Sequence, residues 1–188
     1  MRVIWYTAMS MDGRIADAED SLGFLGLIGE REQDWREEFH EFIAGIDAVL
    51  LGAGTLRWLL ANGHGWPHGD LPTWLVSHDQ DLVVQVGDTE QPFRRVEGDV
   101  AAVLAEIEAA GAGQVWLCGG GDLAAQALAA DRVDEVVVTV APTVLGAGPA
   151  LFDGERLPAR RFRLAECHPA GGDAARLRWT RDREAAGG

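Results

Sequence analysis

The sequence has two cysteines, no lysine and no long apolar run. Cys118 and Cys167 stand far apart in apolar, strand-like segments, which is neither a disulfide framework nor the CxxC spacing of a metal site, so both are expected to be reduced core residues. No apolar run approaches the roughly 20 residues that span a bilayer. The apolar stretch that starts at Arg2 is too short for the core of a signal peptide. We therefore expect a soluble, cytoplasmic protein without a membrane partner.

Positive charge is also scarce. The 188 residues include 30 acidic and 16 basic side chains, which gives a formal net charge of −14 at pH 7. Such a surface repels a nucleic-acid backbone unless its basic groups are strongly clustered, and the sequence shows no such clustering, so no nucleic-acid partner is expected. A phosphate-bearing cofactor would have to be held by local donors such as backbone amides at helix N-termini.

Apolar periodicity is typical of alternating strands and helices along most of the chain. Strands are predicted at 2–8, 47–51, 74–76, 115–118 and 133–140, and helices at 30–46, 56–63, 99–110 and 123–128. Phe162 and Leu164, then Leu177 and Trp179, alternate with polar residues on either side of a glycine turn, which predicts an antiparallel hairpin. This order predicts one α/β domain over residues 1–188, with a mixed, mostly parallel central sheet, helices on both faces and a C-terminal antiparallel hairpin.

Two glycine-rich turns join the carboxyl ends of predicted strands to helices. They are Gly52-Ala53-Gly54-Thr55 and Gly119-Gly120-Gly121-Asp122. Ligands of open α/β sheets bind at that edge, where glycine admits a phosphate close to the backbone and the first helical amides point outward. Strand-to-helix turns also use glycine for purely structural reasons, so each turn alone is weak support. Neither is a Walker loop, because lysine is absent.

Four segments in order resemble the bacterial deaminase-reductase C-terminal domain family, from end to end of the chain. They are residues 8–16 (AMSMDGRIA), 51–55 (LGAGT), 115–123 (VWLCGGGDL) and 143–152 (TVLGAGPALF). The chain looks like the riboflavin-biosynthesis reductase branch and its dihydrofolate-reductase-like relatives. The resemblance implies a three-layer dihydrofolate-reductase-like fold, NADPH as hydride donor and a homodimer. The zinc deaminase motifs to which the riboflavin branch is normally fused do not occur in this sequence.

The resemblance also implies roles for individual residues. Gly52, Gly54 and Thr55 would contact the cofactor, and Ser77 and His78 would flank the adenosine ribose. The diphosphate would be held by Gly119, Gly120, Gly121, Asp122 and Leu123. Ser10 and Asp12 would border the nicotinamide and the substrate. Ala53 stands where dihydrofolate-reductase-like members usually carry arginine, so binding of NADH is not excluded.

Dihydrofolate reductases anchor the substrate ring with a carboxylate on the first helix, and Asp34 or Glu38 lies in the comparable helix here. We select Asp34 as the catalytic and substrate-binding acid, with Asp12 as a second catalytic candidate. A purely structural role is also possible for Asp34 and for Asp12. Asp34 suits the first turn of a helix, where the dipole favours acids, and Asp12 precedes Gly13 in a turn.

Trp66 is predicted to be a lid over a ligand. His64 and His68 are four residues apart, but Gly65 and Pro67 argue against a helix that would aim both at a metal, so no metal is expected. The favoured function is an NAD(P)H-dependent reductase of a small heterocycle such as a pterin, a pyrimidine or a riboflavin precursor. The alternatives are a non-catalytic dinucleotide-binding module and, last, an interaction protein that binds no nucleotide.

Overall fold

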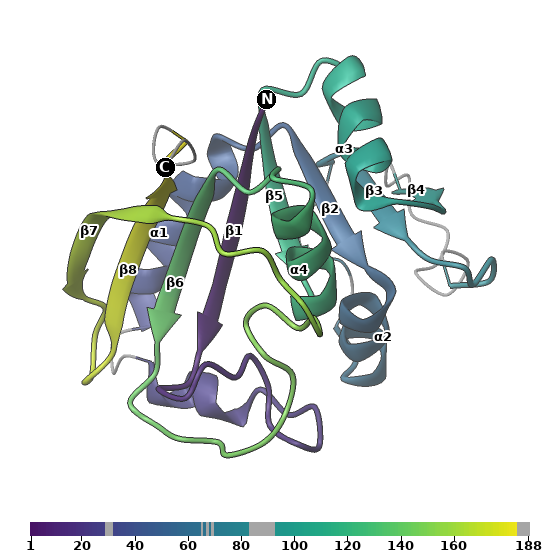
Figure 1. Ribbon diagram of the computed structural model, residues 1–188. Coiled ribbons are helices and arrows are strands. Elements are labelled where there is room, and N and C mark those ends of the chain that lie inside the picture. Colours follow the sequence, from purple (N-terminus) through teal and green to yellow (C-terminus); the bar gives the residue numbers. More distant parts are fainter. Residues whose placement is uncertain (29–31, 65, 67, 69, 83–92, 184–188) are drawn as a thin grey trace.

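The computed structural model is built on one eight-stranded sheet, with the order β4-β3-β2-β5-β1-β6-β8-β7 (Figure 1). It describes residues 1–28, 32–64, 66, 68, 70–82 and 93–183, without the side chains of 32–36. The strands are β1 (Arg2–Met9), β2 (Ala48–Gly52), β3 (Thr73–Val76), β4 (Phe93–Val96), β5 (Gln114–Gly119), β6 (Glu135–Val140), β7 (Phe162–Pro169) and β8 (Ala175–Arg181). The first six run parallel, and β8 pairs antiparallel with both β6 and β7.

Helices cover both faces of this sheet. On one face, α3 (Val100–Ala109) and α4 (Gly121–Ala129) pack on a core that includes Val3, Leu50 and Leu117. On the other, α1 (Glu32–Ala44) and α2 (Ala53–Ala61) pack on a core that includes Val49 and Leu51. Figure 1 shows α3 and α4 in front of the sheet and α1 behind it. The predicted three-layer architecture with a C-terminal hairpin is confirmed.

The central strands are apolar on both faces because both are covered. Residues 48–51 of β2 are all buried, as are residues 135–139 of β6. Strands of this kind read as continuous apolar runs rather than as alternating patterns, which is why they could be recognised in the sequence. A short 3₁₀ helix, η1 (Gly23–Leu27), precedes α1 and was not predicted.

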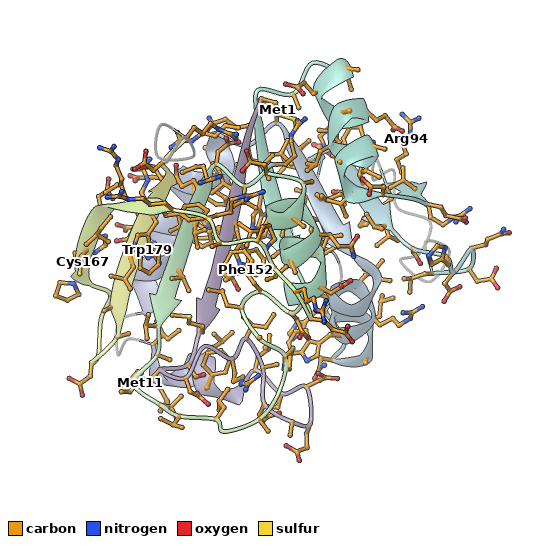
Figure 2. The ribbon with its side chains drawn as sticks, viewed as in Figure 1. Met1, Met11, Arg94, Phe152, Cys167 and Trp179 are labelled. Atoms are coloured by element: carbon orange, nitrogen blue, oxygen red, sulfur yellow. The ribbon has the colours of Figure 1, made fainter. Side chains whose placement is uncertain are left out.

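Two predictions about single residues are wrong. Trp66 is 6% exposed and belongs to the core between the sheet and α1, so it is not a lid. Cys167 is exposed on β7, the outer strand of the hairpin (Figure 2), because this edge strand has no helix over it. Among the described residues, the helices are all too short or too polar to cross a membrane.

Candidate functional site

The two glycine turns meet at the carboxyl edge of the sheet, because β2 and β5 are neighbours and end together. A Cβ atom on Gly52 would lie 2.9 Å from the carbonyl oxygen of Gly119. A Cβ on Gly119 would lie 3.0 Å from the Thr55 hydroxyl, and Gly119 has a φ of +141°, which other residues rarely adopt. Glycine at 52 and 119 is therefore required for the two strand ends to approach each other.

Two helices begin at these turns without a side-chain cap. Gly52 is the N-cap of α2 and Gly120 is the N-cap of α4, and neither has a side chain to accept from the first amides. The contrast is α3, where the Asp99 carboxylate accepts from the amides of Ala101 and Ala102 at 2.7 and 3.4 Å. The first amides of α2 and α4 thus remain available to an anion, with the positive ends of both helix dipoles behind them.

An open cleft of about 1520 Å³ runs along this edge of the sheet. It passes the ends of β3, β2, β5 and β1, and from β4 to β1 the strand order spans about 19 Å at about 4.8 Å per strand. The residues expected to hold a cofactor all line it: Gly52, Gly54, Thr55, Ser77, His78, Gly119, Gly120, Gly121, Asp122 and Leu123. The structure brings these residues together, while their contacts with a cofactor stay a prediction.

The cleft end beyond β3 and β4 is polar and exposed. Arg57 of α2 donates to Asp79 at 3.1 Å, and the His78 side chain, 92% exposed, lies 3.9 Å from Glu97. Arg57 holds the pKa of Asp79 below its usual range, and the guanidinium of Arg95 does the same to the pKa of Glu97. Both carboxylates are therefore charged at neutral pH.

The opposite end, beside β1, combines apolar and polar side chains. The apolar ones include Trp5, Ala8, Ile15 and Leu22, with Leu25 of η1 at the margin, and the polar ones are Thr7, Glu19, Asp20 and Ser21. Trp5 is 1% exposed, and its indole nitrogen has no hydrogen-bond partner among the described residues. The apolar side chains at this end offer a surface on which a ring system can pack.

The Cys118 thiol also lines the cleft but is not a nucleophile. Its removal from water raises the pKa of Cys118 to about 12, so the thiolate is absent at neutral pH. Cys118 is a free, half-buried thiol, which agrees with the reduced state expected for it.

Ser10 and Asp12 join the segment after β1 to the segment between β6 and β7. Neither is among the described residues that line the cleft. The buried Ser10 hydroxyl donates to Asp12 at 2.6 Å and accepts from the Arg14 amide at 2.9 Å. Asp12 also accepts from the amides of Leu145 and Gly146 at 3.0 and 2.8 Å. These bonds, led by that from Ser10, lower the pKa of Asp12 to about 2. Their direct role in catalysis or substrate binding stays a prediction.

The two acids proposed on the first helix have different outcomes. Asp34 lies in α1, but its side chain falls outside the described residues, so its predicted role is untested. Glu38 forms an ion pair with the buried Arg176, which also donates to the Thr139 hydroxyl and lies over the ring of Tyr6. Glu38 is thereby tied to β8 and β6.

The two histidines are held by aromatic rings. His64 stacks on Trp58 with ring centroids 5.8 Å apart, and His68 makes edge contacts with Trp66 and Trp116 at 4.8 and 4.9 Å. Burial lowers the pKa of His68 to about 4, so the ring is neutral at pH 7. Within the part of the chain that is described, no group of His, Cys, Asp or Glu side chains could hold a metal ion.

Sequence reasoning missed the charged residues at the β3 end of the cleft. Asp79 follows Ser77 by two residues and could have been included with it as part of the same strand end. Arg57 lies one turn into α2, on a helix treated only as a source of amides. Glu97 directly follows β4 and was not predicted as a site residue, because the sequence of β4, FRRV, has too few apolar residues to be recognised as a strand.

Known proteins share both sequence and fold with this chain. The sequence profile of the family described as the RibD C-terminal domain matches residues 1–175. YwjB, an uncharacterized protein of Bacillus subtilis (strain 168), is 26% identical over 151 residues, which cover 80% of this chain and 82% of YwjB.

Two crystal structures show the same fold. A Shewanella sp. PV-4 protein provisionally assigned to riboflavin biosynthesis gives a TM-score of 0.83 at 24% identity, over 97% of this chain and 100% of the other. The second structure is a Thermotoga maritima diaminohydroxyphosphoribosylaminopyrimidine deaminase/5-amino-6-(5-phosphoribosylamino)uracil reductase. It gives a TM-score of 0.70 at 18% identity, and 96% of this chain matches 56% of that longer protein.

Proposed function

Because the chain belongs to the RibD C-terminal domain family, we propose that it is a reductase that transfers hydride from NADPH or NADH to a small heterocycle. The observation that carries the proposal is the pair of uncapped helix N-termini, those of α2 and α4, which open into one cleft. Two such anion sites side by side suit the diphosphate of a dinucleotide. The family resemblance favours NADPH, and Ala53 leaves NADH open.

The character of the two cleft ends orients the cofactor. The adenosine would lie toward Ser77 and His78, where the cleft is exposed and charged. The nicotinamide would lie toward β1, where Trp5, Ile15 and Leu22 supply apolar surface. When bound, the cofactor supplies the hydride, and the protein's part is to place it against the substrate in a dry pocket.

The residues around β1 would position the reactants. Ser10 and Asp12 order the segment that leads from β1 into the apolar end of the cleft, by fastening it to residues 145–146. Asp34 of α1 is proposed to anchor the substrate ring and to supply or relay the proton that accompanies hydride transfer. A pyrimidine substrate is supported by the uracil reductase activity named for the Thermotoga relative, and pterins and riboflavin precursors belong to the same chemical class.

Calorimetric titration with NADPH and, separately, NADH tests the cofactor site. Gly120→Val is the informative variant, because Gly120 has an extended backbone and a Cβ there would meet only the Thr55 hydroxyl, at 3.9 Å. The added side chain should therefore occupy cleft space without disturbing the fold. Gly121 is unsuitable, because a Cβ there would lie 2.1 Å from the carbonyl oxygen of Ala150.

We expect at least one dinucleotide to bind the native chain with micromolar affinity and to lose at least tenfold in affinity on Gly120→Val. Gly26→Val is the matched control, since Gly26 has open space around it and is not among the residues lining the cleft. Pterins and pyrimidines would then be screened by the loss of reduced-nicotinamide absorbance. Failure of the native chain to bind either dinucleotide would refute the proposal, and binding without turnover of any heterocycle would favour a non-catalytic module.

A further inference from the structure

The one arginine among the described residues that line the cleft is already paired. Arg57 lies at the β3 end, and its guanidinium donates to the Asp79 carboxylate at 3.1 Å. Dinucleotide sites that accept the 2′-phosphate of NADPH use arginine to bind it, whereas sites for NADH use an acid to accept from the ribose 2′-hydroxyl. Both side chains occur here, and they bind each other.

The geometry of the turn after β3 holds Asp79 in place. The Asp79 amide donates to the Ser77 hydroxyl at 3.0 Å, and the Asp81 amide donates to the Asp79 carboxylate at 3.1 Å. One carboxylate oxygen thus accepts from the chain and the other from Arg57. A 2′-phosphate could recruit Arg57 only by displacing a carboxylate that is fixed independently.

A second carboxylate lies beside the first. Glu97 lines the same cleft end, paired with Arg95 and 3.9 Å from His78. Arg95 is engaged as well, since it also donates to the backbone oxygen of Ser77 at 3.0 Å. A dianionic 2′-phosphate would therefore be repelled by two carboxylates, because Arg57 and Arg95 already bind other groups. A neutral ribose diol could instead donate hydrogen bonds to the same two carboxylates.

We propose that Asp79 makes this cleft select NADH over NADPH, by accepting from the adenosine ribose and by holding Arg57 away from a 2′-phosphate. The inference rests on the proposed function, because it concerns the choice between two forms of the cofactor. It departs from the NADPH implied by the family resemblance. Ala53 is consistent with it, since no basic side chain stands in the first turn of α2.

The test measures the dissociation constants of NADH and NADPH for the native chain, Asp79→Asn and the double variant Asp79→Asn/Arg57→Gln. We expect the native chain to bind NADH at least tenfold more tightly than NADPH. Asp79→Asn removes one negative charge and releases Arg57, so it should shift the affinity ratio toward NADPH by about tenfold. Adding Arg57→Gln should reverse most of that shift.

Asp20→Asn is the matched control. Asp20 lines the same cleft near its β1 end, and its φ of 59° is tolerated by asparagine. The two cofactors are identical at the nicotinamide, so this variant should leave the affinity ratio unchanged. Because the readout is a ratio, a general loss of folding in any variant would lower both affinities and leave the ratio in place.

Two results would overturn the inference while the proposed function stands. One is a native chain that prefers NADPH. The other is an unaltered ratio in an Asp79→Asn variant whose midpoint of urea unfolding equals that of the native chain. Absence of binding of both dinucleotides to the native chain would instead refute the proposed function.

Discussion

Asp12 acts through the backbone of another loop. Its carboxylate accepts from the amides of Leu145 and Gly146, which belong to the segment between β6 and β7. In Figure 2 the neighbouring Met11 lies at the loop beyond β1, and its amide donates to Thr143 at 2.7 Å. Asp12 thus holds the segment after β1 against residues 145–146.

Replacement of Asp12 by alanine should release that loop. The measurement is amide hydrogen exchange at Leu145 and Gly146 at pH 6, which should become at least tenfold faster in Asp12→Ala because both amides lose their acceptor. Since the pKa of Asp12 is lowered to about 2 from 3.8, its contribution is complete above pH 4 and is lost as pH falls toward 2. Exchange rates equal to those of the native chain would contradict this role.

His68 should make folding stability depend on pH. The pKa of this ring is lowered by burial to about 4 from 6.5, so the unfolded chain binds a proton that the folded chain rejects. The contribution is complete above pH 6.5 and is lost as pH falls toward 4. After allowance for its partial exposure, we expect a loss of about 1 kcal/mol between pH 7 and pH 5.

Urea unfolding at both pH values measures this effect. His68→Phe keeps an aromatic ring against Trp66 and Trp116 and cannot bind a proton, so it should remove this part of the pH dependence. An equal pH dependence in the native chain and in His68→Phe would show that other groups cause it.

At the scale of the elements, three α-helices have a described N-cap: that of α3 has a side-chain cap, and those of α2 and α4 do not. Asp99→Ala should destabilise the protein by about 1 kcal/mol, because the amides of Ala101 and Ala102 lose their acceptor. Dinucleotide affinity should not change, since Asp99 does not line the cleft. Urea unfolding and calorimetry measure the two quantities, and a loss of affinity would show that α3 communicates with the cleft.

The central elements could be predicted because their sequences leave few alternatives. β2 and β5 are short apolar runs that end in glycine, and the Asp99 cap and Gly111 bracket α3 correctly. The closeness of the two glycine turns could be predicted because the carboxyl ends of parallel strands lie at the same edge of a sheet. Local sequence patterns were therefore enough to predict the succession of these elements and the sheet edge at which the two glycine turns lie.

Features set by tertiary packing could not be predicted. Trp66 was predicted to be a lid because glycine and proline surround it in the sequence. It is instead buried in the hydrophobic core between the sheet and α1. Cys167 looked buried because its segment alternates, but β7 is an edge strand with no layer above it. The pairing of Arg57 with Asp79 joins residues 22 positions apart, and no local pattern reports such a contact.

At the scale of the whole molecule, positive charge gathers on the C-terminal hairpin. Seven of the 16 basic residues lie between positions 160 and 183. Three of them pair with acids of the preceding segment: Arg181 and Arg183 with Asp131, and Arg178 with the buried Glu135. The pairs tie β8 and the segment after it to residues 131–135, so the basic groups serve the fold and leave the cleft end beyond β3 with little free positive charge.

The outer edge of β7 is where a second copy of the chain would add to the sheet. No described strand pairs with that edge, and the side chain of Leu164, 56% exposed, stands on a face of the same strand. An edge strand without a partner can pair with a second chain, and the family resemblance implies a homodimer. We expect two copies to associate through β7, more tightly as salt screens the repulsion between chains of net charge −14.

Sedimentation equilibrium at low and moderate salt tests this association. Leu164→Lys should weaken the association, because it replaces an exposed apolar side chain of β7 with a charged one and leaves the core unaltered. Val144→Lys is the control, since Val144 is 65% exposed in the segment between β6 and β7, outside both strands of the hairpin, and should leave the association unchanged. A monomeric native chain at both salt concentrations would refute the dimer. A dimer that persists in Leu164→Lys would show that the interface does not involve β7.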